Sequence, residues 1–184
     1  MSLIEIPGRR VRLAILTPDE AALVQVFLRE NREHLAPWEP VRDQAAFELP
    51  AIREKLNKSA LDYQAGNGFH FAVIEQSTGK MIGTCNFSNI VRGVFQACHL
   101  GYAIAASHEG KGLMSEAVDI GIRYMFETVG LHRIMANYMP RNERSAKLLL
   151  RMGFEKEGYA KAYLKIAGVW EDHILTSKIN PRAM

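Results

Sequence analysis

The 184-residue sequence is poor in cysteine and lacks any long run of apolar residues. Its two cysteines, Cys85 and Cys98, stand in strand-like segments without CxxC spacing, which argues against a disulfide or a cysteine-ligated metal. No segment approaches the roughly 20 apolar residues that cross a bilayer. The first residues also lack the basic and apolar regions of a signal peptide. We therefore expect a cytoplasmic protein that does not enter a membrane.

The six histidines show no metal-binding pattern either. None stands in an HExxH arrangement or a zinc-like cluster, so no metal site is predicted. The net charge is +3, and the basic residues are scattered along the chain. This balance permits contact with an anionic ligand or a ribonucleoprotein, but it does not indicate nucleic-acid binding as the main role.

The order of the predicted elements indicates one α/β domain. The sequence has no internal repeat, low-complexity tract or linker, so residues 1–184 are expected to form a single domain. The predicted order of elements is strand, helix, helix, three strands, helix, strand, helix and two strands. This order predicts a mixed (α+β) sheet with helices on both faces. The predicted strands cover residues 11–16, 69–75, 81–90, 95–105, 133–138, 159–166 and 169–179.

Capping signals place the helices. Thr17, Pro18 and Glu20 form a capping box with proline at the first helical position, and this helix is expected to run to about Arg32. Residues 34–40 contain two prolines and are expected to form a loop. Further helices are predicted over 49–65, from Gly110 to about Gly130, and from a cap at Asn142 to Gly153.

A glycine-rich turn, Glu109-Gly110-Lys111-Gly112, joins a predicted strand to a predicted helix. The backbone N–H groups of such a turn, together with the helix dipole, favour a phosphate or diphosphate. A tight connection without a ligand would have the same sequence. The turn is not a P-loop, because Leu113 follows Gly112, and it is not a dinucleotide fingerprint, because Ser115 replaces the third glycine.

A second motif, Asn142-Glu143-Arg144-Ser145, opens the next helix. Asn142 and Ser145 are one helical turn apart, so both side chains lie near the same helix end. On its own, the motif indicates a plain helix cap with a surface hydroxyl at Ser145.

Taken together, these features resemble the GNAT acetyltransferases. The glycine turn stands where that superfamily has its diphosphate-binding Q/R-x-x-G-x-G/A loop, although Ser107 occupies the Q/R position. Longer stretches are similar to the RimJ type of ribosomal-protein-alanine acetyltransferase, and the similarity covers nearly the whole chain. These stretches are NREHLAPWEPVRD (31–43), NFSNIVRG (86–93), HRIMANYMP (132–140) and GFEKEGYAK (153–161).

The resemblance implies a GNAT fold, a mostly antiparallel sheet that splays between its fourth and fifth strands. In this sequence those strands are residues 95–105 and 133–138. Acetyl-CoA is the implied cosubstrate, with its pantetheine arm in the gap and its diphosphate on the glycine turn. The residues implied in binding it are Tyr102, Ala103, Ile104, Glu109, Gly110, Lys111, Gly112, Leu113, Met114, Asn137 and Asn142.

The implied reaction is direct attack of an amine on a thioester. An N-terminal amine has a pKa of about 7.7–8.0 and needs less help than a lysine at about 10.4. Backbone N–H groups at a Gly101 bulge are the candidate oxyanion donors. Ser145 or a water is the candidate general acid. The base is open between His99, which stands where many family members have a glutamate, and Glu39.

Trp38 and Glu39 are expected to border the acceptor side. The first hypothesis is acetylation of the N-terminal alanine of a ribosomal protein, which in the RimJ family is the fifth protein of the small subunit. Association with the ribosome or its precursors is possible. The oligomeric state is left open between a monomer and a homodimer. The alternatives are a small-molecule amine acetyltransferase on the same fold, and a non-catalytic ribosome-assembly factor that binds acetyl-CoA or ribosomal RNA.

Overall fold

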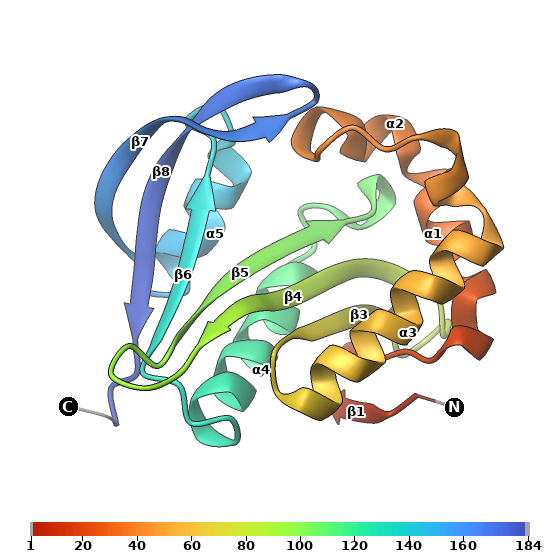
Figure 1. Ribbon diagram of the computed structural model, residues 1–184, viewed down its shortest axis with the longest axis horizontal. Helices are drawn as coiled ribbons and strands as arrows, with labels where there is room; N and C mark the ends of the chain where they lie inside the picture. Colours follow the sequence, from red (N-terminus) through yellow and green to blue (C-terminus); the bar gives the residue numbers. More distant parts are fainter. Residues whose placement is uncertain (1, 183–184) are drawn as a thin grey trace.

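The computed structural model describes residues 2–182, and eight strands form one sheet within that range (Figure 1). The strands are β1 (Ile4–Pro7), β2 (Val11–Ile15), β3 (Phe69–Glu75), β4 (Met81–Val91), β5 (Ala97–Ile104), β6 (Arg133–Tyr138), β7 (Glu155–Ile166) and β8 (Val169–Ile179). Their order in the sheet is β1-β2-β3-β4-β5-β6-β8-β7. All neighbours are antiparallel except β5 and β6, so the mixed, mostly antiparallel sheet is confirmed.

Helices cover both faces of the sheet, as the element order predicts (Figure 1). On one side α1 and α3 pack over β3 and β4, and on the other α4 and α5 pack over β2, β4, β5 and β6. The α-helices are α1 (Ala21–Glu30), α2 (Arg32–Leu35), α3 (Leu49–Ala65), α4 (Leu113–Glu127) and α5 (Glu143–Arg151). Short 3₁₀ helices are η1 (Pro18–Glu20), η2 (Ala36–Trp38), η3 (Gln44–Phe47) and η4 (Ala106–His108). No helix of the described residues is long and apolar enough to span a bilayer.

Successive residues of the central strands are buried because apolar clusters lie on both faces of the sheet. Leu13 and Phe71 belong to the apolar cluster with α4, whereas Ala14 and Ala72 belong to the cluster with α1. Because strand side chains alternate between faces, a strand covered on both sides buries consecutive residues. Cys85 and Cys98 are free thiols buried in this core.

β5 and β6 pair only at the start. Ala97 to His99 of β5 pair with Arg133 to Met135 of β6, and the two strands then diverge (Figure 1). β5 stays paired with β4 as far as Ile104, while β6 stays paired with β8 as far as Tyr138. Each strand therefore follows its own half of the twisted sheet, and the predicted splay is confirmed.

Three sequence expectations were wrong. β1 is an additional edge strand that was not predicted. It has only four residues, and its two isoleucines, Ile4 and Ile6, form too short an alternating pattern to recognise. Residues 34–40 are not a loop, because α2 and η2 extend to Trp38. Pro37 stands at the beginning of η2, where its missing N–H removes no helical hydrogen bond.

The third wrong expectation is the bulge at Gly101. The register between β4 and β5 is unbroken through Gly101, which lies opposite Asn86. The irregularity lies between Ser88 and Val91 instead, where Asn89 has a φ of 52°. A Cβ at Gly101 would meet nothing within 4 Å, so this glycine borders open space.

Gly121 sets how closely α4 approaches the sheet. A Cβ there would lie 2.7 Å from the ring of Phe87 and 3.4 Å from Sγ of Cys85. We expect Gly121→Ala to lower the free energy of unfolding by about 1–2 kcal/mol, because overpacking outweighs the gain in helix propensity. Urea denaturation measures this change.

Asp119→Ala is the control on the exposed side of the same helix. Asp119 forms only an exposed pair with Arg123, so the stability should change by less than about 0.5 kcal/mol. Equal stability of wild type and Gly121→Ala would contradict the close packing.

Candidate active site

A cleft of about 1230 Å³ opens where β5 and β6 separate. Its walls come from the end of β5, the glycine turn, the first turn of α4, α5 along its whole length, and the α2–η2 segment. It brings together most of the residues predicted from the sequence. Those that line it are Trp38, Tyr102, Ala103, Ile104, Glu109, Gly110, Gly112, Leu113, Met114, Asn142 and Ser145.

The edge of β5 offers unpaired backbone groups to this cleft. The N–H groups of His132 and Arg133 both donate to the carbonyl of Gln96, at 2.8 and 3.1 Å, so Gln96 faces β6. Since alternate residues of a strand face the same neighbour, Tyr102 and Ile104, which lie beyond the paired stretch, also present their backbone groups on that side. No described strand pairs with them there. An extended ligand can therefore add to this edge as a strand would.

The glycine turn suits a diphosphate. Gly110 and Gly112 have φ values of 72° and 74°, and a Cβ at Gly110 would meet nothing within 4 Å. Gly112 is the N-cap of the 15-residue helix α4, whose first N–H groups point toward the cleft end of the helix. The turn thus combines open space, main-chain donors and a helix dipole, which together fit an anionic phosphate group.

Two side chains of the turn do not point to such a ligand. Lys111, predicted to bind it, folds back and donates from Nζ to the carbonyl of Ser107 at 2.8 Å. The carboxylate of Glu109 accepts from Arg144 and lies 3.3 Å from Nε2 of His34. Lys111 is outside the cleft lining, and Glu109 is available to an anion only through its backbone.

Tyr102 and Ser145 meet across the cleft. Their hydroxyl oxygens are 2.6 Å apart. Asn142 caps α5 by accepting from the N–H of Ser145 at 3.1 Å, as the capping interpretation predicts. Burial raises the pKa of Tyr102 to about 12, although its hydrogen bond with Ser145 opposes this shift. Tyr102 therefore stays protonated, and Ser145 is not a plain surface hydroxyl.

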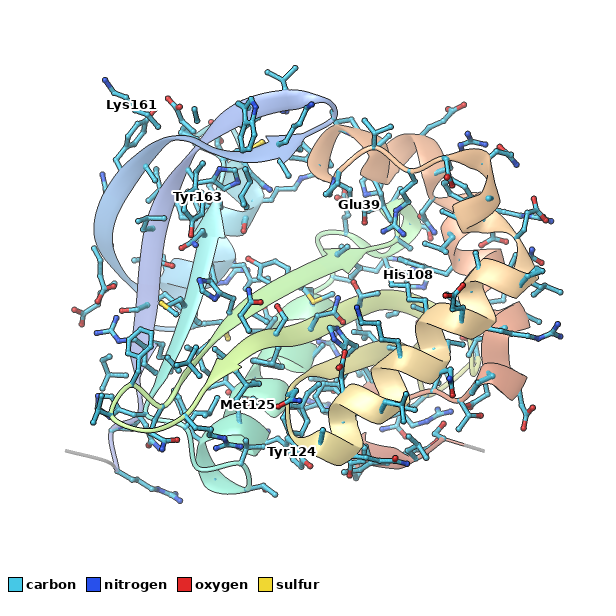
Figure 2. All side chains as sticks on the ribbon, in the orientation of Figure 1. Glu39, His108, Tyr124, Met125, Lys161 and Tyr163 are labelled. Atoms are coloured by element: carbon cyan, nitrogen blue, oxygen red, sulfur yellow. The ribbon has the colours of Figure 1, made fainter. Side chains whose placement is uncertain are left out.

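The two candidate bases lie in different surroundings. His99 is the last β5 residue that pairs with β6, and burial lowers its pKa. Its Nδ1 is buried and has no hydrogen-bond partner among the described residues. Glu39, which is labelled in Figure 2, accepts from Nε of Arg42 at 2.8 Å and lines a separate cavity of about 260 Å³. Neither His99 nor Glu39 is part of the lining of the large cleft. Glu39 is engaged by Arg42, whereas Nδ1 of His99 is unpartnered, so His99 stays the candidate base that could act through a water.

Arg141 was missed by the sequence analysis. It lines the cleft, and its guanidinium lies 5.0 Å from the ring centroid of Trp38. It also donates to Oε1 of Glu171 at 3.0 Å, so it ties η2 to β8. These partners are far apart in the sequence, and no local motif marks them. Trp38 is therefore held in the cleft wall by Arg141.

Asn137 does not line the cleft. Its Nδ2 donates to the hydroxyl of Tyr163 on β7 at 3.4 Å (Figure 2). The ring of Tyr163 in turn lies 5.6 Å from that of His173. The side chain of Asn137 thus belongs to the contacts between β6 and the β7–β8 hairpin.

Comparison with known proteins identifies the fold family. The family model described as an acetyltransferase (GNAT) domain matches residues 10–155. This chain belongs to the GNAT acetyltransferase family. The resemblance, the GNAT fold and the acetyltransferase class are therefore confirmed. GNAT acetyltransferases use acetyl-CoA, which agrees with the unpaired strand edge and the glycine turn.

Individual GNAT relatives cover nearly the whole chain. This chain is 50% identical to the [ribosomal protein uS5]-alanine N-acetyltransferase of Escherichia coli (strain K12) over 155 residues, which are 84% of this chain and 80% of that protein. The ribosomal-protein-S5-alanine acetyltransferase of Vibrio fischeri superposes with a TM-score of 0.92 at 43% identity and 97% coverage of both chains. Mycobacterium smegmatis RimJ, in complex with CoA-disulfide, has a TM-score of 0.90 at 27% identity, covering 97% of this chain and 88% of that chain.

The role of the GNAT glycine turn can be tested at Gly110. Gly110→Ala adds a methyl group where the phosphate must approach, so we expect the Kd for acetyl-CoA to rise at least tenfold (about 1.4 kcal/mol). Isothermal titration calorimetry measures this affinity.

Gly79→Ala is the matched control. Gly79 also has a positive φ, of 71°, and open space around it, but it lies in the turn between β3 and β4. Both variants should lose about the same stability, roughly 1 kcal/mol, from the left-handed backbone. Equal acetyl-CoA affinities of the two variants would contradict a diphosphate at the turn.

Proposed function

We propose that this chain transfers the acetyl group of acetyl-CoA to the N-terminal alanine of ribosomal protein uS5. The observation that carries the proposal is the 50% identity to the uS5-alanine N-acetyltransferase of Escherichia coli over 84% of this chain. The cleft between β5 and β6 supports it, because it joins the unpaired edge of β5 to a wall that contains Trp38 of η2 and Arg141.

Acetyl-CoA supplies the acetyl group as a thioester when it is bound. The backbone N–H group of Tyr102, on the unpaired edge of β5, is the oxyanion donor in this proposal. It replaces the donors expected at a Gly101 bulge, because Gly101 faces β4 through its backbone. The fixed strand holds this group in place before the reaction, so little reorganisation is needed.

Ser145 is the proposed general acid, and Tyr102 supports it. The hydroxyl of Ser145 is a weak acid alone, but it lies 2.6 Å from the phenol of Tyr102. When Ser145 gives a proton to the leaving sulfur, the hydroxyl of Tyr102 can donate a hydrogen bond to the Ser145 oxygen and stabilise the negative charge that develops there, and Ser145 then regains a proton from solvent water. Tyr102 thus supports the acid and keeps its own proton.

His99 is the proposed base. Its lowered pKa leaves the imidazole neutral near pH 7, so Nδ1 or Nε2 can accept a proton, directly or through a water. An N-terminal amine of pKa about 7.7–8.0 requires only modest help. Glu39 is paired with Arg42 outside the large cleft, and in this proposal it supports the acceptor wall by accepting from the N–H of Ala167 through its carbonyl.

We further propose that residues 1–184 act as one domain in the cytoplasm. One sheet runs through the described residues, which supports a single domain. A ribosomal protein is the proposed acceptor, and it is synthesised in the cytoplasm. Binding to the ribosome or its precursors stays a prediction. The oligomeric state, either a monomer or a homodimer, stays a prediction as well.

The function is tested with peptides and mass spectrometry. The purified chain and acetyl-CoA are incubated with a peptide that carries the uS5 N-terminus, the same peptide with a blocked N-terminus but an internal lysine, and spermidine. We expect one acetyl group on the free N-terminal alanine only. Faster acetylation of spermidine would favour a small-molecule enzyme, and no acetylation of any acceptor would contradict the proposal.

The acid role is tested with Ser145→Ala and Tyr102→Phe. Each variant removes one hydroxyl of the pair, so we expect kcat to fall roughly 10- to 100-fold while the Kd for acetyl-CoA changes little. Tyr63→Phe removes a hydroxyl from α3 and should leave kcat unchanged. An unchanged kcat in Ser145→Ala would remove Ser145 from the mechanism.

A further inference from the structure

We propose that Arg10 is a positioning residue, which holds the peptide bond between Lys111 and Gly112 in the orientation that aims the Gly112 N–H at the diphosphate of acetyl-CoA. The proposal rests on the acetyl-CoA dependence of the proposed function, and it does not depend on the identity of the acceptor. Arg10 belongs to the turn between β1 and β2, and it does not line the cleft.

The guanidinium of Arg10 lies directly against the glycine turn. Its Nη1 donates to the carbonyl of Lys111 at 2.9 Å. A Cβ added to Gly112 would lie 3.4 Å from Nη2 of the same guanidinium. Gly112 lines the cleft, whereas Arg10 and Lys111 do not. The side chain of Arg10 therefore supports the turn from the side that faces away from the cleft.

Glu116 holds Arg10 in this place. It stands in α4, four residues after Gly112. Its Oε2 accepts from Nε of Arg10 at 3.0 Å, and its Oε1 accepts from the backbone N–H groups of Arg10 and Val11 at 2.7 and 3.2 Å. The side chain of Glu116 is only 17% exposed, so solvent screens this pair less than it screens a fully exposed one. The β1–β2 turn, the guanidinium and the start of α4 therefore form one fixed unit.

The hydrogen bond from Arg10 fixes the direction of a backbone donor. The peptide bond between Lys111 and Gly112 is trans, so its C=O and its N–H point in opposite directions. Because the carbonyl is turned toward Arg10, the N–H is turned away from Arg10 and toward the cleft. This N–H has no acceptor among the described residues, so it can donate to a phosphate oxygen.

Glycine makes this orientation easy to lose. Gly112 has a φ of 74°, and without a Cβ it adopts either sign of φ at little cost. Rotation of the peptide would turn the carbonyl oxygen of Lys111 toward the cleft, where it would repel the diphosphate. Arg10 opposes this rotation by holding that carbonyl. Since Glu116 balances the charge of Arg10, the contribution of Arg10 is the orientation of the turn and not its net charge.

The experiment measures the Kd for acetyl-CoA by isothermal titration calorimetry, and kcat with the uS5 peptide at saturating acetyl-CoA. We expect Arg10→Ala to raise the Kd roughly tenfold, as a tenfold smaller population of the binding-competent turn would do. The value of kcat should stay unchanged, because the bound cosubstrate still meets the same reacting groups. Arg10→Lys keeps the charge but has a single nitrogen in place of the guanidinium fork, so it should recover little of the affinity.

Arg9→Ala is the matched control. Arg9 precedes Arg10 in the same turn and is exposed, and its side chain forms no hydrogen bond or ion pair within residues 2–182. This variant removes the same charge from the same turn without touching the glycine turn. It should therefore keep the wild-type Kd.

The outcomes separate this inference from the proposed function. A wild-type Kd in Arg10→Ala would overturn the inference. Full recovery in Arg10→Lys, or an equal loss in Arg9→Ala, would assign the effect to charge and overturn it too. A fall in kcat as large as the rise in Kd would indicate a general structural role, which also contradicts it. If wild type binds acetyl-CoA but acetylates no acceptor, the proposed function is wrong and the Kd comparison still decides the role of Arg10. If wild type does not bind acetyl-CoA, both are wrong.

Discussion

The separation of β5 from β6 is the constraint on which the site depends. Two parallel strands that start as neighbours would normally continue to pair, because unpaired backbone groups are costly when they are buried. Here each strand is committed to its own antiparallel neighbour, β5 to β4 and β6 to β8, for its full length. The right-handed twist then carries the two halves apart. The resulting edge of β5 is stable only because it faces a cleft open to water or a ligand.

The two halves of the sheet each supply part of the chemistry. The half with β5 provides Tyr102 and the glycine turn, and the half with β6 and α5 provides Asn142 and Ser145. The proposed base, His99, also lies on β5, but outside the cleft lining. The hydrogen bond between Tyr102 and Ser145 joins the two halves across the gap. Beyond it, Arg141 connects the cleft wall at η2 to β8. Small relative movements of the halves would therefore change the proton donor and the acceptor wall together.

The sequence predicts local features well because their causes are local. The glycine turn, the Asn142 cap and the strand at 133–138 each follow from neighbouring residues. The role of Arg141 depends on Trp38 and Glu171, which only the folded chain brings near. The hydroxyl of Tyr102 was overlooked for the same reason, since only its backbone was assigned to acetyl-CoA. The prediction of a bulge at Gly101 was wrong because a glycine inside a strand can mark either a bulge or open space for a close approach. Here it marks open space.

In the proposed mechanism, the ionisation states of His99 and Tyr102 favour an N-terminal amine over a lysine. Burial lowers the pKa of His99 and raises that of Tyr102, so it keeps both groups uncharged near pH 7. A site that stabilises uncharged groups also disfavours an ammonium, which must lose its proton before or during entry. An α-amine needs about 1–1.4 kcal/mol to become neutral at pH 7, whereas a lysine at a pKa of about 10.4 needs over 4 kcal/mol. The same burial that prepares the acid and the base therefore selects the acceptor by its pKa.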